Sequence, residues 1–207
     1  MNLDLIRADG DELKDCIIFN HYLHRWPDPR SLPFAYRLIV DDSLAAADGW
    51  PHGIVVFKKP QHHKQQGLFG YKGLPTAWQV LDLARVWVHP SWQRREENGH
   101  SLSMFSRMVS RALKRVQRDW LEHHPPRFPE LPYHIELVIS YCELKHHEGT
   151  AYRASNFQKV GKTSDGTKEL YAYRLKAPRW NWTPAQHKAP IQMPLLEGFG
   201  LSYGDTR

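Results

Sequence analysis

The hydrophobic residues of this chain recur with two different periods. Between residues 101 and 122 they return every three to four positions, and this spacing predicts one long amphipathic helix. Elsewhere apolar residues alternate with polar ones or form short runs bounded by Gly, Pro and Asp, which predicts strands. The strands are expected at 34–42, 52–60, 79–90, 133–143 and 169–175.

The long helix is expected to bury one apolar stripe, and two shorter helices are expected at 9–23 and 149–157. The stripe consists of Leu102, Phe105, Val109, Ala112, Leu113, Val116 and Trp120. In the strand at 79–90, alternation predicts two faces. These are Leu83, Arg85 and Trp87 on one side and Ala84, Val86 and Val88 on the other.

The predicted order is helix, two or three strands, long strand, long helix, strand, helix and strand. This order predicts an α+β domain with a mainly antiparallel sheet flanked by helices. A chain of 207 residues fits one domain, which we assign to residues 1–175. Residues 176–207 are Pro-rich without periodicity, and we interpret them as an extended C-terminal arm.

Composition indicates the kind of partner and the compartment. The formal net charge is +6, with 13 histidines besides, and this balance favours a polyanionic partner. Two cysteines are too few for a disulfide framework, and the first residues lack the basic and apolar regions of a signal peptide. No apolar run approaches the length of a membrane span. We therefore expect a soluble cytoplasmic protein with no membrane partner.

One segment, "SYCELKHHEGTAYRASNF" at 140–157, concentrates reactive side chains at a strand-to-helix junction. Each has an ordinary structural interpretation as well. Glu143 can be a solvated carboxylate at a strand end, and Tyr152 can pack in the core. His21 can cap the end of the first helix, and Tyr22 can be a half-buried aromatic. Metal binding would be weakly supported by adjacent histidines alone.

Arg85 lies inside an apolar strand, where an unpaired cation is costly to bury. It therefore either pairs with Asp82 or Glu143 or faces a cleft. We expect it to face the cleft.

The order of elements resembles the acyltransferase fold of the GNAT superfamily. In that fold the strands before and after the long helix separate and form the active-site cleft, which the resemblance places at 80–88 and 134–141. The acyl-CoA pyrophosphate loop would correspond to "SWQRREENGHSLS", with Gln93, Arg94, Gly99 and Ser101 as candidate ligands. The usual glycine pair is absent and two acids are present, so an ordinary charged loop is an equal alternative.

Three segments resemble the Mom family of bacteriophage DNA-modification proteins, over roughly Asn20 to Leu175. They are "NHYLHRWP", "LARVWVHP" and "SYCELKHHEGTAYRASNF". The last segment matches most specifically, although Glu143 stands where the family usually has Asp. Its matching positions are Ser140, Tyr141, Cys142, Glu143, His147, Gly149, Thr150, Tyr152, Asn156 and Phe157. The resemblance implies conversion of adenine in DNA to N6-carbamoylmethyladenine, which protects phage DNA from restriction in the host cytoplasm.

The resemblance also implies roles for individual residues. The functional His-Tyr pair falls on His21 and Tyr22, the acid on Glu143 and the helix phenol on Tyr152. We add Arg85 and Ser140 to this catalytic set. Iron has been proposed for the family, and His21, Glu143 and His147 form the two-His-one-carboxylate inventory that an iron site would use.

The acyl donor stays open between glycyl-tRNA and acetyl-CoA. Direct acyl transfer attaches a carbonyl to N6, whereas carbamoylmethyl attaches a methylene. Glycyl transfer followed by rearrangement reconciles the two, and acetyl-CoA with oxidative or metal chemistry is the competing route. Either requires double-stranded DNA with the adenine flipped out of the stack, and the first also requires tRNA.

A basic stripe on the long helix is the candidate DNA-binding surface. It comprises Arg107, Arg111, Lys114, Arg115 and Arg118, and Lys64 and Lys72 on a preceding loop supplement it. A solvated charged face is the ordinary interpretation. Two other functions remain as alternatives: a conventional GNAT acetyltransferase acting on a protein or small molecule, and a non-catalytic DNA-binding protein.

Overall fold

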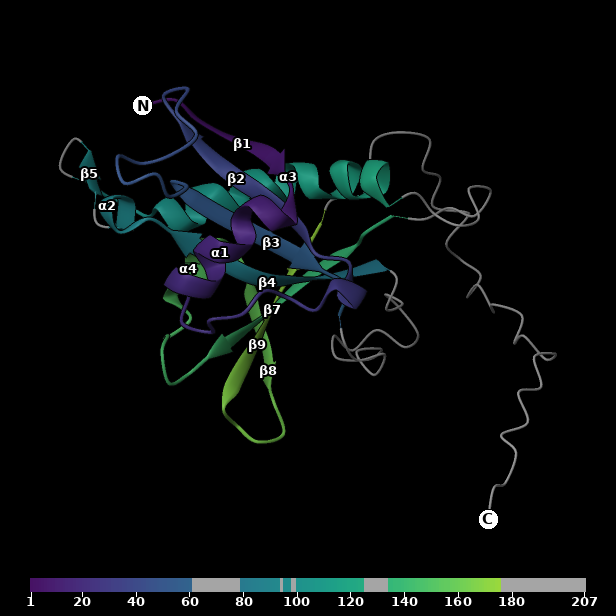
Figure 1. Ribbon diagram of the computed structural model, residues 1–207. Helices are drawn as coiled ribbons and strands as arrows, with labels where there is room; N and C mark the ends of the chain where they lie inside the picture. Colours follow the sequence, from purple (N-terminus) through teal and green to yellow (C-terminus); the bar gives the residue numbers. More distant parts are fainter. Residues whose placement is uncertain (61–78, 94, 98–99, 125–133, 176–207) are drawn as a thin grey trace, which may run out of the picture.

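A seven-stranded mixed sheet forms the centre of the molecule in this computed structural model, which describes residues 1–60, 79–93, 95–97, 100–124 and 134–175 (Figure 1). The strands lie in the order β1-β2-β3-β4-β7-β9-β8. Their bounds are β1 Leu3–Ala8, β2 Phe34–Val40, β3 Gly53–Lys58, β4 Val80–Val88, β7 Leu137–Glu143, β8 Gln158–Lys162 and β9 Lys168–Arg174. The helices are α1 Gly10–Asn20, α2 Pro90–Gln93, α3 Met104–His123 and α4 Thr150–Ala154, with a 3₁₀ turn at Pro29–Ser31 and a small hairpin of β5 Arg95–Glu97 and β6 His100–Leu102. The predicted α+β class is confirmed.

One pair of strands differs from the others in the sheet. All neighbouring strands pair antiparallel except β4 and β7, which are parallel. Their register runs only from Val80↔Leu137 to Asp82↔Ile139, and the two strands then separate. The predicted splayed strand pair is therefore present, and Figure 1 shows β8 and β9 turned away from β1–β3.

Helices cover both faces of the sheet and make three layers. The long helix α3 packs on one face, where Val109, Val116 and Trp120 join the main core cluster. The opposite face meets α1, whose Leu13 and Ile17 pack against residues of β2, β3 and β4. In Figure 1 α1 lies in front of the sheet and α3 behind it.

The long helix begins later than its sequence pattern predicted. Ser103 is its N-cap and accepts a hydrogen bond from the Ser106 N–H, so the helix starts at Met104 rather than near residue 101. The predicted stripe member Phe105 is only partly buried, while Met104 and Met108 are buried.

A β-bulge in β4 overturns the predicted alternation of that strand. Phe57 of β3 faces Leu83 and Val56 faces Arg85, which leaves Ala84 as the extra residue. Leu83 therefore packs in the cluster on the α3 side, whereas Trp87 packs in the cluster with α1. The prediction that Leu83 shares a face with Trp87 was wrong because the bulge shifts the phase between them.

Two edge strands were not predicted. β1 has only two buried residues, Leu3 and Leu5, and β8 is mostly exposed.

The C-terminal arm, residues 176–207, lies outside the described residues. In the part of the chain that the structure describes, no helix is long and apolar enough to cross a membrane. Both cysteines are buried free thiols.

Gly149 provides a test of the packing beneath α4. It has φ +71°, and a Cβ there would lie 2.1 Å from the buried Tyr171 hydroxyl, which is bonded to Glu169 and Arg153. Gly149→Ala should lower the free energy of unfolding by about 3 kcal/mol through backbone strain and overpacking. Gly166→Ala is the control, since Gly166 has φ +70° and open space around it, and it should cost about 1–2 kcal/mol. Equal costs in urea denaturation would show that the Tyr171 contact does not matter.

Candidate active site

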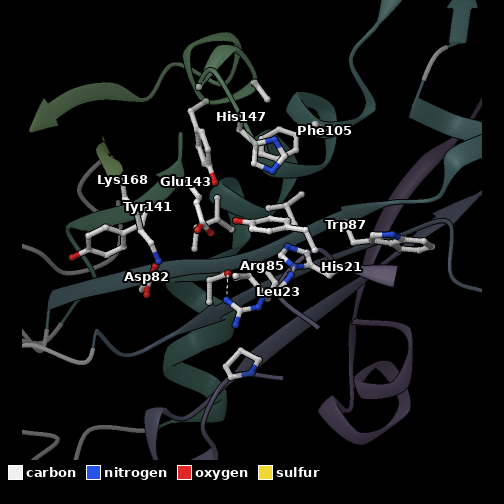
Figure 2. A pocket seen from close by; sticks show the side chains of 18 of the residues that line it. His21, Leu23, Asp82, Arg85, Trp87, Phe105, Tyr141, Glu143, His147 and Lys168 are labelled. Carbon is white, nitrogen blue, oxygen red and sulfur yellow. Dashed lines mark hydrogen bonds between the residues drawn. The ribbon is translucent and has the colours of Figure 1, made fainter. Parts of the chain in front are cut away.

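The separation of β4 and β7 opens a cleft of about 1280 Å³ (Figure 2). Its walls come from the end of α1 and the loop that follows it, from β4, from the start of α3 and from β7 and α4. The turn between β8 and β9 closes one end. The cleft thus joins segments from the first and last thirds of the described chain.

Most of the side chains singled out in the sequence lie in this cleft. The lining includes His21, Tyr22, Arg85, Glu143, His147 and Tyr152. Figure 2 shows His21, Arg85 and Glu143 directed into the same space, with His147 above them. The other predicted catalytic residue, Ser140, is buried behind Tyr152.

His21 is held as a neutral imidazole that carries its proton on Nε2. It is the C-cap of α1, and its Nδ1 accepts the Leu23 N–H at 3.1 Å. Burial, followed by the charge of Arg85, lowers the pKa of His21 to about 3. With Nδ1 occupied as an acceptor, the single ring proton of the neutral form is on Nε2. A His21 in this form presents a hydrogen-bond donor.

Tyr22 separates the imidazoles of the predicted metal set. Its ring stacks on His21 at a centroid distance of 4.4 Å and meets His147 edge-on at 5.1 Å. Burial, and then the nearby Glu143, raise the pKa of Tyr22. Among the described residues, no three His, Cys, Asp or Glu side chains form a group that could hold a metal ion. His21, Glu143 and His147 therefore line one cleft without assembling the expected iron site.

Arg85 faces the cleft, as expected from the sequence. Its Nη1 donates to the Ala84 carbonyl at 2.6 Å and its Nε donates to the Arg25 carbonyl at 3.3 Å. Asp82, one of its two expected partners, instead pairs with Lys58. Burial lowers the pKa of Arg85, but these carbonyls keep the guanidinium hydrogen-bonded.

Ser140 of β7 connects the two separating strands and also contacts Tyr152 of α4. The Ser140 hydroxyl donates to the Leu83 carbonyl at 2.9 Å and lies 3.0 Å from the Tyr152 hydroxyl. Since Ser140 has one hydroxyl proton and a carbonyl cannot donate, the Tyr152 proton is directed to Ser140. Burial raises the pKa of Tyr152, so this phenol keeps its proton at neutral pH.

The predicted acyl-CoA loop is only partly described. Arg94 and Gly99 lie outside the described residues, and Ser101 lies on the hairpin strand β6. Gln93 lines the cleft, but its amide nitrogen donates to the Val88 carbonyl at 2.8 Å and so fixes the end of β4. The start of α3, with Ser103, opens onto the cleft and has no acidic residue in its first turn. A ligand phosphate there would meet helix N–H groups.

The basic stripe of α3 is partly committed to structural contacts. Arg111 and Arg115 donate to the backbone carbonyls of Leu3 and Leu5 on β1. Arg115 and Arg118 both pair with Asp119 at 3.1 and 3.0 Å. Lys64 and Lys72 lie outside the described residues.

What remains of the stripe borders a shallow groove of about 410 Å³ between α3 and α4. The groove is lined by Ser106, Arg107, Ser110, Arg111, Lys114, Ala154, Ser155 and Asn156. It contains no acidic side chain among these residues, so it is a positively charged groove.

Several cleft residues were not assigned roles from the sequence. Lys58, Asp82, Tyr141 and Lys168 lie along its floor, on β3, β4, β7 and β9. The sequence had singled out Asp82 as a possible partner of Arg85 and Tyr141 as a matching position of the 140–157 segment, without a role for either in the cleft. The positions of the others depend on strand register, which a single sequence does not reveal.

The neutral form of His21 makes stability depend on pH. Because burial lowers the pKa of His21 from 6.5 to about 3, the unfolded chain binds more protons between these values, and stability falls as pH drops through them. His21→Gln should reduce the pH slope of the unfolding free energy in that window by up to about 1.4 kcal/mol per pH unit. Nitrogen NMR at pH 7 should show the Nε2–H tautomer. An imidazolium or an Nδ1–H tautomer would contradict this assignment.

Comparison with solved structures identifies the fold. Arabidopsis thaliana NAA60 in complex with acetyl-CoA matches 85% of this chain and 100% of its own, with 11% identity and a TM-score of 0.50. A GNAT-family acetyltransferase from Listeria monocytogenes matches at 14% identity, covering 84% of this chain and 95% of its own, with a TM-score of 0.47. The ribosomal-protein-S18-alanine N-acetyltransferase from Escherichia coli matches at 12% identity, covering 88% and 99%, with a TM-score of 0.43. No protein-family model and no curated protein matches the chain. The chain has a GNAT acetyltransferase-like fold.

Proposed function

We propose that this protein is an acyltransferase whose acceptor is the exocyclic amine of adenine in DNA, and whose product is N6-carbamoylmethyladenine. The observation that carries the proposal is the convergence of His21, Tyr22, Glu143 and Tyr152 in one cleft. These four residues were selected because their segments resemble the Mom family, and they come from distant parts of the chain. The GNAT acetyltransferase-like fold supports an acyltransferase independently of that resemblance.

In this proposal the acid and the imidazole have different tasks. His21 donates from Nε2, so it suits an oxygen that becomes negative during acyl transfer. Glu143 is then the residue left to accept a proton from the amine, since carboxylates are acceptors when ionised. Of the two bases considered from the sequence, the proposal therefore keeps Glu143.

Tyr152 is suited to protonate the leaving group. Its raised pKa preserves the phenol proton, and Ser140 holds that proton until a more basic oxygen or sulfur arrives. Tyr22 and Arg85 border the same space and would orient the substrate. Proton donation of this kind typically accelerates a reaction by about 10²–10⁴-fold.

A glycyl donor gives the product without an oxidant. The adenine N6 attacks the ester carbonyl of glycyl-tRNA, loses a proton to Glu143, and the ribose oxygen leaves with a proton from Tyr152. The free glycyl amine then attacks C6, and the former N6 leaves C6 as the nitrogen of the new amide. The rearrangement only moves bonds within the adduct. Acetyl-CoA would need an additional oxidation and a nitrogen source to reach the same product.

DNA would reach the cleft with its target base rotated out of the duplex, at a cost of a few kcal/mol. The groove between α3 and α4 is the best candidate for phosphate contacts, since Lys114 is exposed on its edge. The same groove would equally suit the backbone of a tRNA donor.

A second candidate is a conventional acetyltransferase that uses acetyl-CoA and acts on a protein or small-molecule amine. The fold comparison favours it, because the Arabidopsis structure was solved with acetyl-CoA. Saturable binding of acetyl-CoA without DNA, together with unmodified cellular adenine, would establish this candidate over the first.

Nucleoside mass spectrometry of DNA from cells that express the protein tests the proposal directly. Deoxyadenosine should gain the mass of one carbamoylmethyl group. Glu143→Gln and Tyr152→Phe should each reduce this product by about 100-fold or more, because each removes a proton-transfer group. Glu122→Gln, on the exposed face of α3, and Tyr173→Phe, on β9, are the matched controls and should retain the product. Persistence of the product in both cleft variants would refute the assigned roles.

The salt dependence of DNA binding tests the groove. Lys114→Gln should reduce the slope of log K against log salt by about 0.9, the value for one released phosphate counterion. Arg118→Gln is the control and should change the slope less, because Arg118 already pairs with Asp119 and Glu122. Equal changes in the two variants would show that DNA does not follow this groove.

A further inference from the structure

A buried ion pair lies on the floor of the cleft and has no part in the proposed chemistry. Lys58 and Asp82 face each other across β3 and β4, and their Nζ and Oδ2 atoms are 3.0 Å apart. Each side chain is only 10% exposed, and both residues line the cleft. Burying such a pair adds little to stability, because desolvation offsets most of the attraction.

The pair lies where the strands begin to separate. Asp82 is the last residue of β4 that pairs with β7, opposite Ile139. Tyr141 follows two positions further along β7, so its side chain lies on the same face of the sheet as that of Ile139. Figure 2 shows Tyr141, Asp82 and Lys168 grouped on one side of the cleft.

The two charged groups offer a ligand one acceptor beside one donor. Lys58 contacts one oxygen of Asp82. The carboxylate's other oxygen can therefore accept a hydrogen bond from a ligand, and the ammonium's other protons can be donated to it. Tyr141 adds an aromatic surface on which a flat ring can stack. A planar heterocycle with an N–H group next to a ring acceptor matches both features.

We propose that Lys58 and Asp82 bind the edge of an amino-substituted nucleobase, with Asp82 accepting from the exocyclic amine and Lys58 donating to the adjacent ring nitrogen. This subsite deepens the proposed function and rests on it for the nature of the acceptor. Adenine, with N6 beside N1, and cytosine, with N4 beside N3, both present this pair of groups.

The arrangement disfavours guanine held by its two neighbouring donors, N1–H and N2–H. A free carboxylate can accept from both N1–H and N2–H of guanine, but Lys58 already occupies one oxygen of Asp82. The guanine edge would also bring a second N–H toward the Lys58 ammonium. Thymine lacks the amine that acyl transfer requires.

Asp82 would also position the amine for reaction. Glu143 lines the same cleft from the end of β7, and its register partner is Lys168 on β9. The amine has two protons, so Asp82 can hold one while Glu143 removes the other. The pair thus orients the acceptor without itself transferring a proton.

Binding of short single-stranded DNA tests the subsite independently of catalysis. The probes are thymine tracts with one central adenine, 1-deazaadenine (which lacks N1) or purine (which lacks the amine), measured by fluorescence anisotropy. The wild-type protein should bind each analogue about tenfold more weakly than adenine, since each loses a hydrogen bond to a charged group. Lys58→Met should abolish the penalty for 1-deazaadenine and keep the penalty for purine.

Two variants distinguish a role of the pair in base binding from a role in folding. Lys58→Met leaves Arg85 and Lys168 beside Asp82, so the carboxylate keeps neighbouring positive charge. The combined Lys58→Met and Asp82→Leu variant leaves no charged member of the pair and should bind all three probes equally. Thermal unfolding confirms that each variant is folded at the temperature of the assay. A purely structural pair would not change the ranking of the probes.

The outcomes distinguish this inference from the proposed function. Equal binding of the three probes by the wild-type protein, or an unchanged ranking in the variants, overturns the subsite. If the ranking changes as expected while cellular adenine stays unmodified, the subsite stands and the proposed reaction fails. A further thymine tract with a central cytosine that binds more tightly than the adenine probe would assign the subsite to a pyrimidine and overturn adenine as the acceptor.

Discussion

The arrangement of the site depends on where hydrogen bonding between β4 and β7 stops. Backbone pairing between them ends at Asp82 and Ile139, and the peptide groups beyond that point that face the other strand need another partner or solvent. Ser140 supplies one, because its hydroxyl bonds to the Leu83 carbonyl directly after the last pair. The strands are therefore joined by a side chain at the base of the cleft and diverge above it. The same serine contacts the hydroxyl of Tyr152, so the residue that joins the strands at the base of the cleft also positions the phenol.

The bulge at Ala84 determines which side chains line the β4 wall of the cleft. It changes the phase of β4 between Leu83 and Arg85, and Arg85 then lies in the cleft rather than in the core beneath α3. The released Ala84 carbonyl accepts from the displaced guanidinium. This local exchange of hydrogen bonds offsets part of the cost of burying a cation and keeps Asp82 available for Lys58.

Elements with a strong local signal could be predicted, and those defined by register could not. The periodicity of α3 and the apolar runs of β2, β3, β4 and β7 predicted the α+β class, and the resemblance of their order to the GNAT fold implied the position of the cleft. Edge strand β1 is short and has little periodicity, so it was not predicted. Without β1, the backbone carbonyls that bind two arginines of the basic stripe were missing from the prediction. From the sequence, Arg111 and Arg115 were expected to be available for DNA binding, but they donate hydrogen bonds to carbonyls of β1. The Lys58–Asp82 pair is likewise a product of cross-strand register, and nothing in the local sequence of either residue indicates it.

In the proposed function, the side chains that line the cleft do not select between the two acyl donors. Glycyl-tRNA and acetyl-CoA both present an activated carbonyl and a leaving group that needs a proton, and a donor such as His21 Nε2–H with a phenol such as Tyr152 serves either. What differs between them is the long phosphate-bearing part behind the acyl group. For that part the described surface offers the start of α3, at the edge of the cleft, and the positively charged groove between α3 and α4. In the proposed function, selection between the two donors therefore falls to the α3 surface, and substitutions there should separate donor use from the chemistry of the cleft.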